Sequence, residues 1–166
     1  MTEPAMSVDP DVDLHAPEQR RELRPSPWPV LASISAGGVL GSLARYGLSE
    51  ALPHPAGGFA WATFAVNVSG CLLIGVLMVL VNQVWSRRRL VRPFLGVGVL
   101  GGYTTFSTYV VDAQRAVVAG APETALLYLA ATLAAALLAV WAGTAVTSAA
   151  VGRWRARPAG GEAGGR

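Results

Sequence analysis

The sequence predicts an all-α integral membrane protein with four transmembrane helices, the third of which is broken by polar and glycine-rich residues. Three observations lead to this prediction. Hydrophobic residues make up 52% of the 166 residues and charged residues only 14%, which is too apolar for an ordinary soluble domain. The apolar residues gather in four long runs, and arginines cluster at the ends of those runs.

The four runs cover about residues 28–48, 59–84, 94–119 and 124–146. Each approaches the ~20 residues needed to cross ~30 Å of hydrocarbon. Each should be a helix, because a lone span must satisfy its backbone hydrogen bonds internally. The flanking residues 1–26 and 150–166 are polar or rich in Gly, Ala and Pro, so we expect them to be disordered on either side of a transmembrane domain over residues 27–149.

The arginine clusters predict the orientation of the chain. They lie before the first run, between the second and third, and after the fourth: Arg20, Arg21 and Arg24; Arg87, Arg88, Arg89 and Arg92; Arg153, Arg155 and Arg157. All three fall on one side, so the positive-inside rule predicts a cell-membrane protein with both termini in the cytoplasm. The net charge of +3 does not lie along one helix face, and nucleic-acid binding is not expected. The single cysteine, Cys71, excludes a disulfide or a cysteine-rich metal site within this chain.

Polar and small residues inside the first two runs need an explanation. Gly37 and Gly41 form a GxxxG pattern, which favours close helix packing. The carboxamide of Asn67 must find partners where lipid offers none, either by bonding another helix or by lining a pore. Arg45, near the outer end of the first run, either extends to the headgroups or attracts anions into a vestibule.

The third run contains the most informative segment, Gly96–Tyr109 (GVGVLGGYTTFSTY). Glycine pairs and β-branched threonines make a poor helix, so we expect a break near Gly101 to Thr105. Non-helical backbone at this depth is tolerated only where it is buried in protein or lines a cavity. A break frees carbonyl groups that can hold a cation and amide groups that can face an anion.

Beyond the predicted break, Phe106 and Tyr109 are three residues apart and share a helix face, with Ser107 and Thr108 beside them. Such a pair commonly serves packing. Aromatic ring edges are electropositive, however, so the same pair can meet an anion edge-on. Together with Asn67 and the hydroxyl groups, the rings would suit a small, strongly hydrated anion.

Three motifs together resemble the Fluc (CrcB) family of fluoride channels, over about residues 28–148: Gly41–Tyr46 (GSLARY), Ala65–Gly70 (AVNVSG) and Gly101–Tyr109 (GGYTTFSTY). The resemblance implies a passive, fluoride-selective channel that exports cytoplasmic fluoride and is not an enzyme. It also implies an antiparallel dimer of four-helix subunits, with two pores at the interface and a structural Na⁺ on the dimer axis.

Carried over by position, Asn67 resembles the pore asparagine of the family and Arg45 its first-helix arginine. Phe106 and Tyr109 resemble its two stacked phenylalanines, and the carbonyls of Gly101 and Thr104 resemble its sodium ligands.

Two residues depart from the family pattern. Tyr109 stands where phenylalanine is usual, which adds a hydroxyl that can donate to fluoride or impair one pore. Asp112 replaces a usual glutamate and its role stays open. Thr132, one turn after Tyr128, is a further candidate for the pore lining.

Alternative functions are a small multidrug or cation exporter and a non-conducting membrane assembly protein. An exporter of that kind needs a carboxylate in its first span, where only Arg45 is ionisable. The one-sided arginines are unlike a chain that inserts both ways, so we expect a homologous subunit of opposite orientation as the partner, and otherwise a second copy. The remaining expected partners are the fluoride ion and the lipid bilayer.

Overall fold

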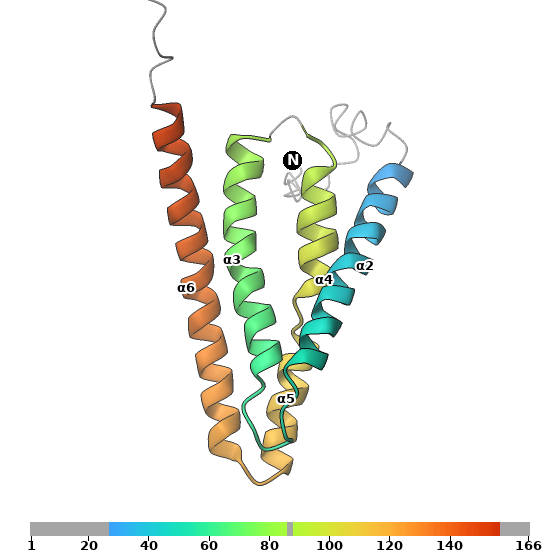
Figure 1. Ribbon diagram of the computed structural model, residues 1–166, viewed down its shortest axis with the longest axis vertical. Helices are drawn as coiled ribbons and strands as arrows, with labels where there is room; N and C mark the ends of the chain where they lie inside the picture. Colours follow the sequence, from blue (N-terminus) through green and yellow to red (C-terminus); the bar gives the residue numbers. More distant parts are fainter. Residues whose placement is uncertain (1–26, 86–87, 157–166) are drawn as a thin grey trace, which may run out of the picture.

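The computed structural model describes residues 27–85 and 88–156, and all regular structure within these residues is helical. The elements in chain order are α2 (Trp28–Ala51), α3 (Trp61–Gln83), η1 (Arg92–Leu100), α4 (Gly101–Tyr103), α5 (Ser107–Val118) and α6 (Pro122–Arg155). The long helices run side by side, and η1, α4 and α5 follow one another along a single interrupted rod (Figure 1).

Three of these segments are long and apolar enough to cross a membrane: Trp61–Gln83, Arg92–Val118 and Pro122–Arg155. Helix α2 has 24 residues, but it is not among the three. Its many small residues, with one arginine and one glutamate near its end, reduce its hydropathy relative to the others. The structure therefore confirms an all-helical membrane protein with three candidate spans.

The helices pack in two pairs, since α2 contacts mainly η1 and α4 while α3 contacts mainly α6 (Figure 1). Glycines allow this closeness. A Cβ at Gly41 would overlap the Val99 carbonyl oxygen and lie 2.8 Å from the Tyr103 nitrogen. In the other pair, a Cβ at Gly75 would lie 2.5 Å from the Val140 carbonyl oxygen. Backbone therefore meets backbone in both pairs, which confirms the packing interpretation of Gly41.

Two features differ from the sequence-based expectations. Residues Arg92–Leu100 form a π-helix, a rare conformation for which the sequence offers no signature. Helix α6 continues past the expected boundary at residue 149 to Arg155, whose guanidinium donates a hydrogen bond to the Gln83 carbonyl at the end of α3. The predicted disorder of residues 1–26 and 157–166 lies outside the described residues.

Arginines gather at one end of the bundle. Helix α2 begins there, α3 ends there, η1 begins there and α6 ends there (Figure 1). Arg88, Arg89 and Arg92 are therefore at the same end as Arg153 and Arg155. Arg45 and Arg115, near the C-terminal ends of α2 and α5, lie toward the opposite end.

Candidate functional site

The predicted break in the third span is present, and it lies in the C-terminal part of the expected stretch. Gly101 is still helical, with φ −65° and ψ −37°, whereas Thr104 is extended, with φ −75° and ψ 158°. Helix α5 then starts at Ser107. The break therefore includes Thr104 and Thr105 of the expected stretch, whereas Gly101 at its start stays helical. The chain leaves the helix where a side chain from α3 provides an alternative hydrogen-bond partner.

That side chain is Asn67. Its Nδ2 donates to the Thr105 carbonyl oxygen at 2.9 Å, and the Thr105 N–H donates to its Oδ1 at 2.9 Å. The carboxamide thus satisfies both backbone groups of a residue that has left the helix. The interhelical bonding expected of Asn67 is therefore observed. A carboxamide has two N–H donors, so one remains for another acceptor.

Thr105, which was not singled out among the candidate site residues, caps the start of α5. The Thr108 N–H donates to Thr105 Oγ1 at 3.1 Å, three residues on, as at a helix N-cap. The Thr105 hydroxyl in turn donates to Thr108 Oγ1 at 3.0 Å, and its side chain is buried. A threonine just before a helix is a recognised start signal, so the sequence did contain this information.

The N-terminus of α5 presents donors to the break. Within the described part of the chain, no acceptor takes a hydrogen bond from the N–H of Phe106 or of Ser107. Unsatisfied N–H groups carry the positive end of the helix dipole, and they attract anions.

The break opens onto a recess of about 400 Å³, called here the break recess. Its lining brings together most of the predicted site residues: Asn67, Gly101, Thr104, Phe106, Tyr109 and Thr132, with Thr105 and Cys71 between them. Three predicted residues lie elsewhere: Ser107, Thr108 and Arg45. Thr108 lines a separate pocket, and the exposed Ser107 has its Oγ 3.4 Å from Thr105 Oγ1. Ser107 and Thr108 therefore support the break and do not line this recess.

The separate pocket, about 210 Å³ in volume, lies beside Arg45. The Arg45 guanidinium donates to the Thr104 carbonyl oxygen at 3.4 Å, so it is turned toward the break and not toward the headgroups. Thr105 lines both this pocket and the break recess. The arginine thus places positive charge on one side of the break, as the vestibule interpretation requires.

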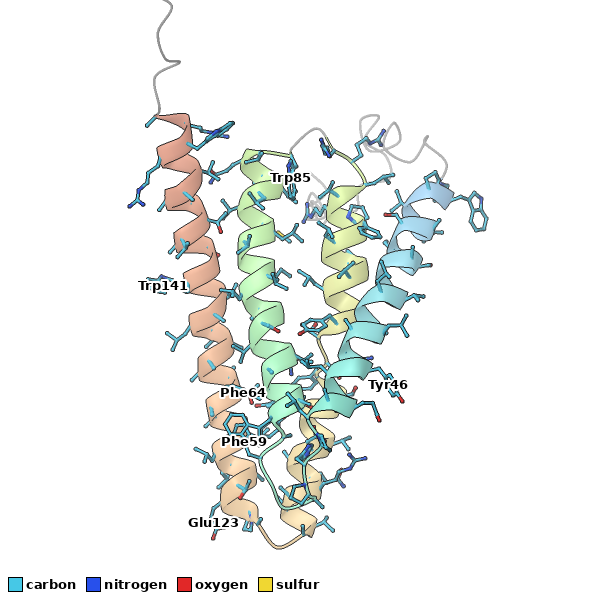
Figure 2. All side chains as sticks on the ribbon, viewed as in Figure 1. Tyr46, Phe59, Phe64, Trp85, Glu123 and Trp141 are labelled. Atoms are coloured by element: carbon cyan, nitrogen blue, oxygen red, sulfur yellow. The ribbon has the colours of Figure 1, made fainter. Side chains whose placement is uncertain are left out.

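The aromatic pair shares a face as predicted, with the Phe106 and Tyr109 ring centroids 5.9 Å apart and the planes tilted by 45°. Tyr109 also packs against Tyr128 at 5.3 Å, which packs in turn against Phe59, one of the side chains labelled near α6 in Figure 2. The Tyr109 hydroxyl donates to the Leu129 carbonyl oxygen at 2.8 Å, so its proton is not available to a fluoride ion in this arrangement. The Phe106 ring is 77% exposed in the single chain.

Asp112 and Thr132 are both buried. The Thr63 hydroxyl donates to Asp112 Oδ2 at 2.7 Å, and the Arg115 guanidinium lies 3.5 Å from Asp112 Oδ1. Asp112 therefore joins α5 to α3. The Thr132 hydroxyl donates to the Tyr128 carbonyl at 2.7 Å within α6, which leaves its oxygen as an acceptor at the edge of the break recess.

The carbonyls expected to hold sodium differ in their partners. The Gly101 carbonyl accepts from no donor among the described residues, because the Thr105 N–H is bonded to Asn67. The Thr104 carbonyl oxygen accepts a hydrogen bond from the Arg45 guanidinium. Residues 27–85 and 88–156 contain no group of three His, Cys, Asp or Glu side chains suited to a metal, so a cation there would depend on carbonyl oxygens. Gly101 fits that role, and Thr104 fits it only if Arg45 releases its carbonyl.

Comparison with known proteins identifies the family. Residues 32–144 match the family described as CrcB-like protein, Camphor Resistance (CrcB), which is more than half of the chain. The chain belongs to the CrcB family. The break, its asparagine partner and the arginine of α2 all fall inside the matched residues. The resemblance inferred from the three sequence motifs is thereby confirmed.

Curated relatives within the CrcB family carry the name fluoride-specific ion channel. The chain is 54% identical to "Fluoride-specific ion channel FluC 2" of Streptomyces avermitilis, over 75% of this chain and 79% of that protein. It is 56% identical to "Fluoride-specific ion channel FluC 1" of Streptomyces coelicolor, over 68% of this chain and 73% of that protein. It is 54% identical to "Fluoride-specific ion channel FluC 2" of Thermobifida fusca, over 76% and 93% respectively.

Proposed function

We propose that this chain forms a passive, fluoride-selective channel that exports fluoride from the cytoplasm and so protects the cell from fluoride toxicity. The observation that carries the proposal is the break itself. It presents the N–H groups of Phe106 and Ser107, with the remaining N–H of Asn67 nearby, next to aromatic rings. Such donors can replace the water around a small anion, while the rings exclude larger hydrated ions. Relatives at 54–56% identity named fluoride-specific channels support the choice of ion.

Transport by this channel needs no coupled ion. Hydrogen fluoride that enters from an acidic medium dissociates at cytoplasmic pH, and the trapped fluoride leaves down its electrochemical gradient. A coupled exporter would need a titratable group on the path. The residues that line the break recess include no carboxylate and no histidine, in agreement with passive flow.

The complete pore needs a second subunit. In the proposed assembly α2 is a fourth crossing, both termini are cytoplasmic, and a homologous subunit of opposite orientation packs against the exposed Phe106 ring. The one-sided arginines favour such a heterodimer over two copies of this chain. The carbonyls of Gly101 and Thr104 from both subunits would hold a Na⁺ on the dimer axis, with Arg45 withdrawn from Thr104. Bound sodium would supply a fixed positive charge between the two breaks.

Reconstituted liposomes test the proposal. Vesicles loaded with fluoride or chloride are diluted into anion-free medium, and efflux is followed with ion-selective electrodes. We expect fluoride efflux and negligible chloride efflux from vesicles that contain this chain with its homologous partner. Equal fluxes of the two ions would contradict fluoride selectivity, and no flux of either would favour a non-conducting assembly protein. Robust fluoride efflux from this chain alone would contradict an obligatory heterodimer.

A further inference from the structure

An apolar groove lies between α3 and η1, toward the end of the bundle where the arginines gather. Its volume is about 230 Å³, and its lining is aliphatic except for one tryptophan: Leu73, Val76, Leu77, Leu80, Trp85, Leu95, Val99 and Leu100. From Leu73 to Leu80 the groove follows α3 for about 10 Å of helix rise. Both walls belong to candidate membrane spans, so the groove lies at the depth of lipid acyl chains.

The groove ends at a basic loop. Trp85, two residues beyond the end of α3, is one of its lining residues and lies at the end of the bundle where the arginines gather (Figure 2), and the Arg88 backbone N–H donates to the Trp85 carbonyl at 2.8 Å. Arg92 begins η1, three residues before the groove residue Leu95. Arg88, Arg89 and Arg92 are all exposed, and no acid among the described residues forms an ion pair with them. Aliphatic walls thus lead directly to a site of concentrated positive charge.

The groove and the break recess use different faces of α3. The α3 residues that line the groove are Leu73, Val76, Leu77 and Leu80. Those that line the recess are Asn67, Gly70, Cys71 and Ile74. With 100° between successive helical residues, the two sets are centred about a third of a turn apart. The groove and the recess share one lining residue, Leu100, so an occupant of the groove would lie beside the recess but on a different face of α3. Its presence does not depend on whether the chain conducts ions.

We propose that this groove binds an anionic phospholipid. One acyl chain lies between α3 and η1, and the phosphate is bound by Arg88, Arg89 and Arg92. Guanidinium groups bind phosphate oxygens through paired, charge-assisted hydrogen bonds. In a zwitterionic lipid, the cationic group of the headgroup offsets the negative charge of the phosphate, so its attraction to the arginines is weaker. The Trp85 ring lies between chain and headgroup, at the depth that tryptophan prefers. Each arginine near an anionic surface contributes about fivefold in affinity.

Native mass spectrometry of the assembled, full-length protein tests this proposal. The protein is released from micelles that contain equal amounts of phosphatidylglycerol and phosphatidylcholine, and retained lipids are counted. We expect retention of phosphatidylglycerol over phosphatidylcholine. The combined substitution Arg88→Gln, Arg89→Gln and Arg92→Gln should reduce the preference by about fivefold for each arginine removed. Arg153→Gln, an exposed arginine on α6 at the same end, should leave it unchanged.

A second pair of variants tests the groove separately from the charge. Leu73 is 48% exposed and lines the groove, whereas its neighbour Leu72 is 42% exposed and does not. Leu73→Trp should fill the groove and reduce phosphatidylglycerol retention at least about fivefold, and Leu72→Trp should not. Equal retention in these two variants would overturn the groove. Equal retention of the two lipids by the unaltered protein would overturn the phosphate site. No retained lipid in the assembled protein would mean that a partner subunit covers the groove, which also overturns the proposal.

Discussion

Asn67→Ala should weaken the junction between α4 and α5 more than any other single polar substitution in α3. The substitution removes the donor to the Thr105 carbonyl and the acceptor for the Thr105 N–H, two hydrogen bonds of 2.9 Å. Each buried backbone group left without a partner costs about 1–3 kcal/mol, so the loss is about 2–6 kcal/mol. Alanine recovers at most about 0.7 kcal/mol through its higher helix propensity. The net loss in the free energy of unfolding is therefore at least about 1 kcal/mol.

Reversible unfolding in mixed detergent micelles, followed by circular dichroism, measures this loss. Asn82→Ala is the matched control, because Asn82 lies exposed in the last turn of the same helix and makes no side-chain hydrogen bond to the described residues. It carries the same change in helix propensity, and we expect its effect to stay within about 0.5 kcal/mol. If the two variants unfold alike, the Asn67 bridge does not stabilise the break and the reasoning is refuted.

Asn67→Asp separates the bridge from ion passage. A carboxylate can accept the bond from the Thr105 N–H but cannot donate to the Thr105 carbonyl, and it places a charge inside a candidate span, so this variant should be less stable than the unaltered chain. A negative charge about 4 Å from a passing anion raises its energy by about 4 kcal/mol at an intermediate dielectric constant. Fluoride efflux should therefore fall at least about tenfold. Unchanged efflux would place the ion path away from Asn67.

Three further predictions concern helix packing, the Tyr109 hydroxyl and access to the break recess. Gly41→Ala should destabilise the protein by about 1–3 kcal/mol in the same unfolding assay, because the added Cβ meets the backbone of η1 and α4. Gly38→Ala is the control and should be neutral or stabilising, because no atom lies within 4 Å of its Cβ. Tyr109→Phe removes the hydrogen bond to the Leu129 carbonyl, so the free energy of unfolding should fall by about 0.5–1.5 kcal/mol. Fluoride efflux should stay within about twofold, and its loss would show that the hydroxyl takes part in ion passage. A small charged methanethiosulfonate reagent should block efflux by modifying Cys71 in the recess. Cys71→Ala should abolish that block, and persistent inhibition of this variant would contradict the location of the ion path in the recess.

The sequence predicted the three candidate spans and the existence of the break, because long apolar runs and clustered glycines and threonines are local signals. It could not predict where the break begins. That point depends on Asn67, 38 residues earlier in the chain, which takes the Thr105 N–H away from the helix. Before folding, Gly101 and Thr104 look equally unsuited to a helix. Only the packing of α3 against the third span distinguishes them.

The roles of single polar side chains were harder to predict than the helices. Asn67 had two interpretations that the sequence left equal, interhelical bonding and pore lining; the structure shows its bonds to Thr105 and also places it in the lining of the break recess. The Tyr109 hydroxyl was a candidate donor to fluoride, yet the Leu129 carbonyl in α6 takes its proton. Arg45 near a helix end normally extends toward water, but here a carbonyl freed by the break lies within its reach.

The close backbone contact between α2 and the η1–α4 segment has a mechanical consequence. Where side chains interdigitate, a small shift of one helix can be absorbed by changes of rotamer. At Gly37, Gly41 and Gly98 backbone faces backbone, so there is no side chain to absorb a shift. Helix α5 is instead fixed to α6, through the Tyr109 hydroxyl among other contacts. The residues of the break thus lie at the joint between the α2–η1–α4 group and the α5–α6 pair. Their spacing is therefore set by how those two groups of helices are held relative to each other.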